Sequence, residues 1–170
     1  MDHVAIMKKS LGLIPKIVSG EKSIESRWYQ TKRAPWDKIQ TGDTVFFKNA
    51  GEPVAAEAEV AQVLQLEIKD LSEARAITRE YGDEIGLDNQ DPSTWGKLPK
   101  YCILVWLQEP RKVERPFQVD KEGFGMGTAW LSVDDINKIK IPAEISHEVV
   151  LFDVEADNEM ESPKETLHSR

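Results

Sequence analysis

The chain of 170 residues carries 22 Lys or Arg and 30 Asp or Glu residues, which gives a formal net charge of −8. Its hydrophobic content of 40% is enough for a packed core, so a wholly disordered chain is excluded, and the length suits a single domain. The longest apolar run, Ile103–Leu107, is far shorter than a membrane span of ~20 residues, and the acidic balance argues against loose coating of nucleic acid by a basic surface.

The charge is distributed unevenly along the chain. Residues 1–40 contain eight basic and four acidic side chains, a local excess of +4, whereas residues 41–100 contain six basic and twelve acidic ones. A local basic surface within the first forty residues is therefore compatible with the sequence. The chain has one cysteine, Cys102, and Lys8 follows the first hydrophobic stretch rather than preceding it as in a signal peptide. We expect a cytoplasmic protein.

The first thirty residues predict two strands and a short helix. A short apolar run over 3–7 is typical of a strand, and the apolar spacing that follows predicts a helix over 13–19. Pro15 is compatible with that helix only in its first turn, and Gly20 is the residue expected just after its last turn. The segment 23–29 then resumes as a strand.

The middle of the chain predicts two strands and a second helix. A compact strand over 44–48 precedes a long alternating strand over 54–66, whose later part loses strict alternation and suggests a bulge or bend. Asp70 can cap a helix over 71–81, whose apolar residues share one face. The polar segment 82–100 is expected to be a loop with at most one helical turn.

The last part of the ordered region is expected to contain two more strands. The most hydrophobic segment, 101–107, predicts a central strand, and 111–119 predicts a separate strand in which Pro116 requires an edge or a bulge. A short helix is expected to begin at Ser132 or Asp134.

Together these elements predict an α+β fold built on a small, strongly bent β-barrel. Five or six mixed strands form the barrel, and short helices flank it. We expect one domain over residues 1–150. The remaining residues, 151–170, form an acidic tail whose composition predicts disorder.

One pattern is more specific than the rest and combines a helix end, a strand and a turn. It consists of six residues in a fixed order, Gly20, Lys22, Glu25, Arg27, Gly42 and Asp43. This pattern resembles the signature of the ASCH domain family within the PUA-like superfold: a helix ending in Gly-x-Lys, then x-x-Glu-x-Arg, then Gly-Asp before a strand. The resemblance extends over 16–66 for the motif and over 3–140 for the order of the elements.

The resemblance implies a cleft beside the helix–strand junction and ligands of the RNA or nucleotide class. Some small bacterial ASCH proteins look like amidohydrolases that act on acylated cytidine and use a Lys and a Thr nucleophile within this motif. Here the Lys position is Lys22, but the Thr position is occupied by Glu25. A carboxylate does not replace a hydroxyl nucleophile in that route.

The residue types of the motif suit a ligand site. A strand over 23–29 puts Glu25 and Arg27 on the same face, close to Lys22. The two cations are candidates for binding phosphate, and Glu25 can accept a hydrogen bond from an exocyclic amino group. Trp28 or Trp130 is a candidate to stack on a base. The same groups also fit an ordinary surface ion-pair set, and each tryptophan also fits core packing.

We expect neither a metal nor a cofactor, because three scattered histidines and one cysteine form no pattern of metal ligands. Our leading hypothesis is a module that binds RNA, a nucleotide or a nucleoside in the Lys22/Glu25/Arg27 cleft. A second hypothesis is a hydrolase of a modified nucleoside or RNA, with Glu25 as general base and Lys22 stabilising developing negative charge. A third is a protein-interaction domain that uses the acidic tail and residues 41–100. Whether the protein is an enzyme, and its oligomeric state, stay open at this stage.

Overall fold

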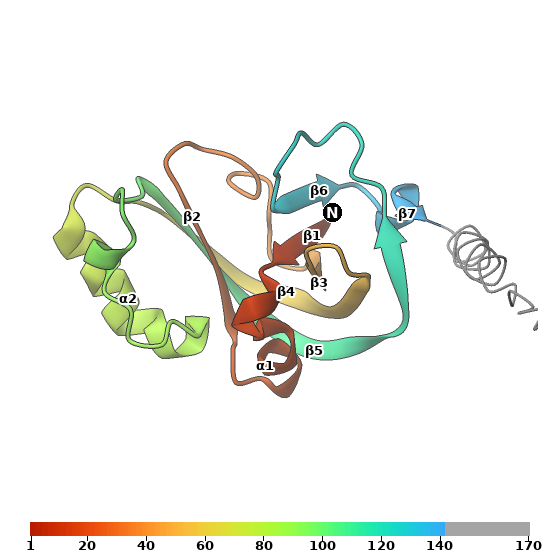
Figure 1. Cartoon of the computed structure of the whole chain (residues 1–170), viewed down its shortest axis with the longest axis horizontal. Helices are drawn as coiled ribbons and strands as arrows, with labels where there is room; N and C mark the ends of the chain where they lie inside the picture. Colours follow the sequence, from red (N-terminus) through yellow and green to blue (C-terminus); the bar gives the residue numbers. More distant parts are fainter. Residues whose placement is uncertain (142–170) are drawn as a thin grey trace, which may run out of the picture. The chain divides into compact units, whose positions relative to one another are not determined.

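The computed structural model describes residues 1–141, which contain seven strands and two α-helices (Figure 1). The strands are β1 (Asp2–Met7), β2 (Ile24–Tyr29), β3 (Thr44–Asn49), β4 (Val54–Glu67), β5 (Tyr101–Val119), β6 (Trp130–Val133) and β7 (Lys140–Ile141). The helices are α1 (Leu13–Ser19) and α2 (Leu71–Ile85), with short 3-10 turns at Lys9–Leu11, Pro92–Thr94 and Ile136–Lys138. The predicted boundary at residue 150 and the tail 151–170 lie outside the described residues.

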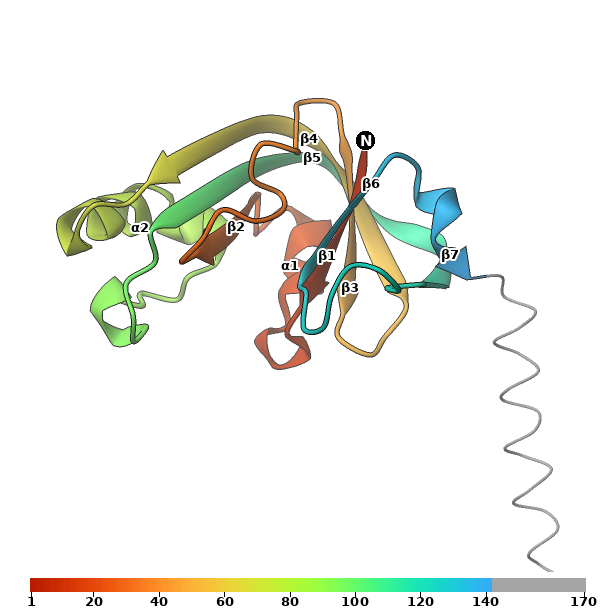
Figure 2. The same cartoon turned by 90° about the horizontal axis from the view of Figure 1, so that it is seen from above.

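The strands form one curled, mixed sheet in the order β2-β5-β4-β3-β1-β6, and β7 pairs with β5. Strands β1 and β3 run parallel, whereas the other pairs along this order are antiparallel. The two longest strands, β4 and β5, lie side by side and carry the bend of the sheet (Figure 2). The predicted α+β fold with a bent sheet of mixed strands and flanking helices is confirmed.

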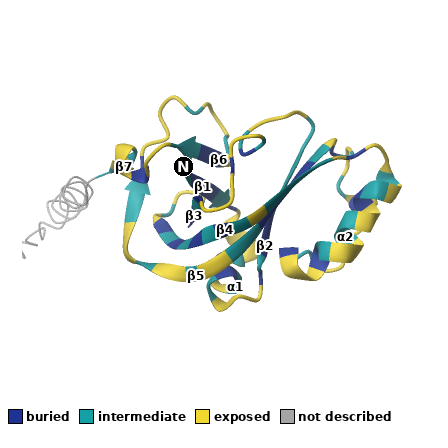
Figure 3. Ribbon diagram, turned by 180° about the vertical axis from the view of Figure 1, so that it is seen from behind, coloured by how far each residue is buried: buried dark blue, intermediate teal, exposed yellow. Residues whose placement is uncertain are grey.

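The two helices cover different parts of the sheet, and Figure 3 shows where its residues are buried and that much of the second half of β5 is exposed. On one face α1 inserts Ile17 against Phe47 and Val105, all fully buried. At the other end of the sheet, α2 covers a second cluster that includes Ile24 and Leu104. The edge strand β2 therefore lies between the two helices, and its residues reach the cleft described below.

The local rules for α1 and β2 hold in the structure. Helix α1 begins at Leu13, places Pro15 in its first turn and ends at Gly20, whose φ of 82° lies in the left-handed region favoured by glycine. The N–H of Gly20 donates to the carbonyl of Ile17 and closes the last turn. The chain enters β2 a few residues after this turn. The conformation of the helix end therefore determines where Lys22 and Glu25 lie.

The predicted separation of two strands at 101–107 and 111–119 is wrong, because β5 is continuous from Tyr101 to Val119. Both prolines of this region, Pro110 and Pro116, fall in stretches of β5 where its register with β4 shifts. Next to the first of them, Glu109 adopts a φ of 50°. A proline has no N–H to donate to the neighbouring strand, but a bulge leaves a residue of β5 unpaired in any case. The strand therefore bends at the bulges instead of ending.

Helix α2 is longer than the predicted 71–81 and runs to Ile85. Asp70 caps its start as expected, with the carboxylate accepting a hydrogen bond from the N–H of Glu73 at 2.9 Å. The helix continues through Gly82 and ends at Gly86, which has a φ of 82°. A glycine inside a helix weakens it by only ~1 kcal/mol, which packing of α2 against the sheet overcomes.

The helix predicted to begin at Ser132 or Asp134 is also corrected. Residues 130–133 form β6, which pairs antiparallel with β1, and a single 3-10 turn over Ile136–Lys138 follows. The carboxylate of Asp135 caps that turn by accepting from the N–H of Asn137. No helix within residues 1–141 is long and apolar enough to cross a bilayer.

Candidate functional site

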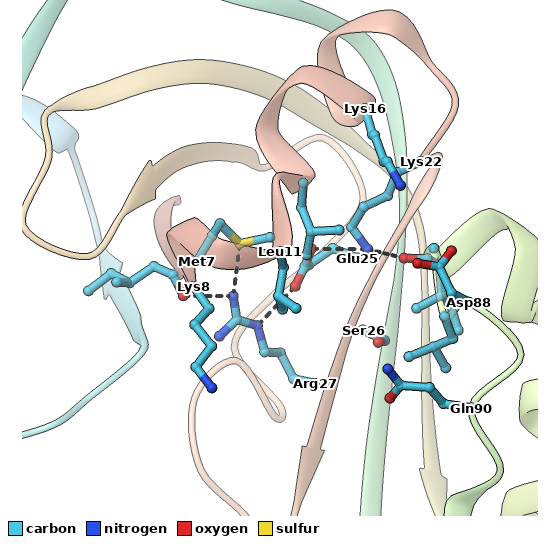
Figure 4. Close-up of a pocket in the computed structure, with 15 residues that line it drawn as sticks. Met7, Lys8, Leu11, Lys16, Lys22, Glu25, Ser26, Arg27, Asp88 and Gln90 are labelled. Atoms are coloured by element: carbon cyan, nitrogen blue, oxygen red, sulfur yellow. Dashed lines mark hydrogen bonds and ion pairs between the residues drawn. The ribbon is translucent and has the colours of Figure 1, made fainter.

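A cleft of about 380 Å³ lies where α1, β2 and the segment after α2 meet (Figure 4). Three stretches of chain line it: the end of β1 through to Lys16 in α1, the residues from Lys22 to Arg27, and the segment 85–90. Three of the five predicted site residues meet here, namely Lys22, Glu25 and Arg27.

Glu25 lies at the base of the cleft with its side chain only 4% exposed. Its Oε1 accepts a hydrogen bond from Nε of Arg27 at 3.1 Å. Its Oε2 lies 3.5 Å from Nζ of Lys22 and, although buried, accepts no hydrogen bond from any of the described residues. A buried carboxylate oxygen without a hydrogen-bond donor is costly, and Glu25 lines the cleft, so its carboxylate is the candidate acceptor for a molecule that enters there.

Lys22 is a buried cation with a structural role. Its side chain is 3% exposed, and its Nζ donates to the carbonyl of Ile24 at 2.8 Å and to the carbonyl of Ile85 at the end of α2. Burial lowers the pKa of Lys22, and the neighbouring charge of Glu25 offsets only part of that effect. The ammonium group therefore ties the end of α2 to the start of β2.

Arg27 braces the other side of Glu25. Its guanidinium donates to the carbonyl of Ala129 at 3.1 Å and to the carbonyl of Ile6 at 3.4 Å, in addition to its bond with Glu25. It also lies over the ring of Trp130, 5.1 Å from the ring centroid. Most donors of this planar group are thus used within the protein, and they hold Glu25 in a fixed orientation.

The other two predicted site residues, Trp28 and Trp130, do not line the cleft. Trp28 lies on the opposite face of β2, where its ring packs edge-on against Trp95 with centroids 4.8 Å apart. Trp130 is 2% exposed, and its indole Nε1 donates to Nδ1 of His3 at 3.1 Å. In this structure both rings are packed within the protein.

Comparison with solved structures places this arrangement in a known fold. The structure of the ASCH protein from Zymomonas mobilis superposes with a TM-score of 0.56 and 16% sequence identity, covering 88% of this chain and 94% of that chain. Two single-residue variants of the same protein also give a TM-score of 0.56, with 16% and 15% identity, and cover 96% and 95% of their chains. This chain has the ASCH fold.

The resemblance indicated by the sequence motif is therefore confirmed at the level of the fold. Neither a protein-family model nor a curated protein sequence matches the chain. The likeness consequently rests on three-dimensional structure, over almost the whole of the other chain.

Within this ASCH fold the Gly-Asp part of the motif serves the core rather than the cleft. Gly42 has a φ of 90°, and the turn places Asp43 so that its Oδ2 lies 2.9 Å from Nε2 of the buried His3. The same carboxylate oxygen accepts from the N–H of Gln40 at 2.9 Å. The Gly-x-Lys and Glu-x-Arg parts line the cleft, whereas the Gly-Asp part fixes the entry to β3.

Five polar residues that line the cleft were not predicted from the sequence, and one of them, Ser26, lies on β2 itself. Lys8 and Lys16 lie at its rim, and Asp88 and Gln90 approach from the segment after α2 (Figure 4). The two lysines belong to the first forty residues, whose excess of positive charge is compatible with a basic surface but does not indicate which residues form it. Asp88 and Gln90 are more than sixty residues from Glu25 in sequence, and only the packing of α2 brings them near.

Within residues 1–141, no cluster of three or more His, Cys, Asp or Glu side chains is arranged to hold a metal ion. The buried Cys102 lies in the middle of the sheet, and burial raises the pKa of its thiol far above the usual range. The charged and polar groups that line the cleft are the buried carboxylate of Glu25, its two cationic neighbours and the polar residues of the rim.

Proposed function

We propose that this ASCH-fold protein binds a nucleotide in the Lys22/Glu25/Arg27 cleft, either free or as one unit of an RNA chain. The volume of about 380 Å³ falls in the range of small-molecule sites, about 300–1,000 Å³. Apolar side chains line part of the wall, among them Leu11, Leu13 and Leu87. A flat base or a sugar can bury apolar surface against such a wall while its polar edge faces Glu25.

The observation that carries this proposal is Oε2 of Glu25, which accepts no hydrogen bond from the described residues and lies 3.5 Å from Nζ of Lys22. A carboxylate oxygen only accepts hydrogen bonds, so it selects a partner with an N–H or O–H group. Cytosine, adenine and guanine carry an exocyclic amino group, whereas uracil presents a carbonyl oxygen in the corresponding place. We therefore assign base recognition to Glu25, with bases that bear an amino group preferred.

The phosphate contact is assigned to Lys8 and Lys16 rather than to Lys22 and Arg27. The latter two donate to backbone carbonyls and to Glu25, which leaves them few free donors. Lys8 is exposed and Lys16 is half-buried at the rim, and both line the cleft. Lys22 and Arg27 then act by positioning the carboxylate and by adding positive charge beneath the ligand.

The first test is a calorimetric titration and a thermal-shift comparison of the 5′-monophosphates of cytidine, adenosine, guanosine and uridine. A ligand that binds only the folded state raises its stability by RT ln(1 + [L]/Kd). We expect at least one amino-bearing nucleotide to bind at least tenfold more tightly than uridine monophosphate. Equal affinity for all four would remove Glu25 as the base reader. No binding by any nucleotide or RNA would overturn the proposal and favour a protein partner.

Two variants separate the base contact from the phosphate contact. Glu25→Gln introduces an amide N–H that can donate to uracil, so the preference over uridine monophosphate should narrow or reverse. Lys8→Gln combined with Lys16→Gln should weaken nucleotide binding but leave nucleoside binding unchanged. Lys9→Gln is the matched control, because Lys9 is exposed, does not line the cleft and lies 3.4 Å from Glu52.

A second candidate function, hydrolysis of a modified nucleoside, is favoured by the pairing of Glu25 with a cation of lowered pKa. Oε2 of Glu25 accepts no hydrogen bond from the described residues and can take a proton from an attacking water, and Lys22, 3.5 Å away, lies close enough to stabilise negative charge. Incubation with N4-acylated cytidine, followed by chromatography, should then show product that Glu25→Gln abolishes while binding persists. Turnover that is unchanged in Glu25→Gln would exclude this mechanism.

A further inference from the structure

A second basic surface lies at the far end of β2, away from the cleft. It is formed by three short segments, 29–33, 67–69 and 97–101, which contain five cations and a single acid, Glu67. The cations, called here the basic patch, are Lys32, Arg33, Lys69, Lys97 and Lys100. All five are exposed, in a chain whose formal net charge is −8.

Strand pairing and hydrogen bonds bring these segments together. Tyr101 lies opposite both Tyr29 and Glu67, since β5 runs between β2 and β4. The backbone N–H of Lys100 donates to the carbonyl of Tyr29 at 2.9 Å. The side chain of Gln30 donates to the carbonyl of Leu98 at 2.8 Å. The patch is therefore part of the folded sheet end, and its cations are carried on fixed backbone.

Two of the cations lie over aromatic rings. Nζ of Lys32 lies 5.4 Å from the ring centroid of Trp36 and 5.6 Å from that of Tyr101, and the guanidinium of Arg33 lies 5.2 Å from that of Tyr29. Each ring restricts the cation above it without neutralising its charge. Glu67, the acid within these three segments, lies 3.8 Å from Nζ of Lys32 and is 65% exposed, so this ion pair is weak.

A groove of about 460 Å³ is lined by one of these aromatic residues, Tyr101, and by Lys69, Lys97 and Lys100. Three exposed lysines that line one groove suit a flexible anionic chain better than a compact anion, because each can contact a different phosphate of the chain. Partly exposed tyrosine and tryptophan rings and the guanidinium of Arg33 offer flat surfaces for unpaired bases. An acidic peptide would use the same charges but would leave these flat surfaces without a function.

The patch also lies in line with the cleft. Glu25, Arg27 and Tyr29 alternate along β2, so their side chains share one face of the strand, and Figure 4 shows the first two pointing the same way. Four residues of strand span about 13 Å, a distance that an oligonucleotide of a few units bridges. A nucleotide in the cleft therefore has neighbours within reach of the patch.

We propose that the basic patch binds the phosphate backbone of single-stranded RNA, so that the ligand of this protein is an RNA chain rather than a free nucleotide. This inference rests in part on the proposed function, because it extends the same ligand from the cleft along β2. The patch by itself predicts a length-dependent and salt-dependent contribution to affinity.

The test uses the full chain and fluorescence anisotropy with a labelled cytidine octamer, compared with calorimetry of cytidine monophosphate. The patch variant is Lys97→Glu combined with Lys100→Glu. The matched control is Lys112→Glu combined with Arg115→Glu, two exposed cations on the distant part of β5, which changes the net charge equally. Both variants are first checked for an unchanged melting temperature.

We expect the octamer to bind at least tenfold more tightly than the monophosphate. The patch variant should lose at least tenfold of this affinity, while the control loses less than threefold. Removing two phosphate contacts should also reduce the slope of log K against log salt by about 1.4. Affinity for the monophosphate should not change in the patch variant, since neither residue lines the cleft.

Equal losses in the two variants, or an octamer that binds no better than the monophosphate, would overturn the proposal. Polyglutamate that competes as strongly as RNA, and through the same lysines, would assign the patch to an acidic protein and equally overturn it. Octamer binding that depends on the patch, without any monophosphate binding, would support the patch while rejecting the nucleotide cleft.

Discussion

Nε2 of the buried His3 lies 2.9 Å from Oδ2 of Asp43, and this contact joins β1 to the turn before β3. On its other side, Nδ1 of His3 is 3.1 Å from Nε1 of Trp130 and 2.9 Å from Oγ of Ser132. An indole N–H only donates, so Nδ1 must be the acceptor and the ring proton sits on Nε2. The network therefore requires a neutral imidazole and links three strands, β1, β3 and β6, through one side chain.

The first prediction is that stability falls on mild acidification because of His3. Burial lowers the pKa of His3 below 6.5, although the hydrogen bond and charge of Asp43 offset part of this effect. The unfolded chain then binds more protons than the folded one below pH 6.5, so stability is complete above that pH and is lost as pH decreases. One proton limits the slope to about 1.4 kcal/mol per pH unit. Urea unfolding between pH 7.5 and 5.5 measures it.

His3→Gln should flatten this pH dependence, because it removes the titrating group. A variant with Gln at the chain's other two histidines, His147 and His168, is the control and should keep the slope of the natural chain. The experiment stays above pH 5 so that the carboxylate of Asp43 does not titrate within its range. Partial burial would raise the pKa of Asp43, but hydrogen bonds from His3 and Gln40 hold that pKa below its usual range. Parallel curves for the His3 variant and the natural chain would contradict the assignment.

The second prediction is that Lys22→Met destabilises the fold by about 3 kcal/mol, even though methionine is the more hydrophobic residue. The change removes the donor to the carbonyls of Ile24 and Ile85 and leaves the buried Glu25 without one of its two cations. Urea unfolding should report it. Lys9→Met is the control and should change stability by less than about 0.5 kcal/mol, because its ion pair is exposed. A stable Lys22→Met protein would show that the ammonium is not a structural tie.

Local sequence patterns predicted the elements around the site because their signals lie within a few residues. The apolar spacing of 13–19, the glycine at 20 and the alternation of Glu25 and Arg27 each depend on backbone geometry alone. The same patterns also indicated the family resemblance, which the fold confirms. Four of the six motif residues are therefore placed by a helix end and the strand that follows it.

The features that the sequence did not predict depend on contacts between residues far apart in the chain. The approach of Asp88 to the cleft depends on where α2 ends, and that end lies beyond a glycine that local rules treat as a stop. The sequence offered both Trp28 and Trp130 for stacking, but the ring of Trp28 packs against Trp95 and that of Trp130 is buried beside His3, and both partners lie far away in sequence. Strand β5 is continuous because bulges against β4 accommodate its two prolines, whereas in the sequence the same prolines suggest that the strand ends.

The third prediction concerns two glycines four residues apart that should respond in opposite directions. Gly82 lies inside α2, and a Cβ added there meets no atom within 4 Å, so Gly82→Ala should stabilise the protein by about 0.5–1 kcal/mol. Gly86 has a φ of 82° and closes the helix by donating to the carbonyl of Gly82, so Gly86→Ala should destabilise by about 1 kcal/mol.

Thermal or urea unfolding of the two variants, each measured against the natural chain, checks the signs. Since Gly86 also lines the cleft, its variant should lose nucleotide affinity as well, whereas Gly82→Ala should keep it. A stabilising Gly86→Ala would mean that helix propensity, and not the backbone conformation at Gly86, dominates this end of α2, and a destabilising Gly82→Ala would contradict the first half of the prediction.

The fourth prediction is that Arg27→Lys weakens both the fold and the cleft, although charge is preserved. A lysine ammonium cannot reach Glu25, Ala129 and Ile6 at once, whereas the planar fork of arginine contacts all three. We expect a loss of about 1–3 kcal/mol in unfolding free energy, and faster hydrogen exchange at the N–H of Ile6, which donates to the carbonyl of Ala129. Arg115→Lys, at an exposed position, is the control and should change neither. If Arg27→Lys leaves this exchange rate unchanged, the loop before β6 does not depend on the arginine, and the bracing of Glu25 would have to come from Lys22 alone.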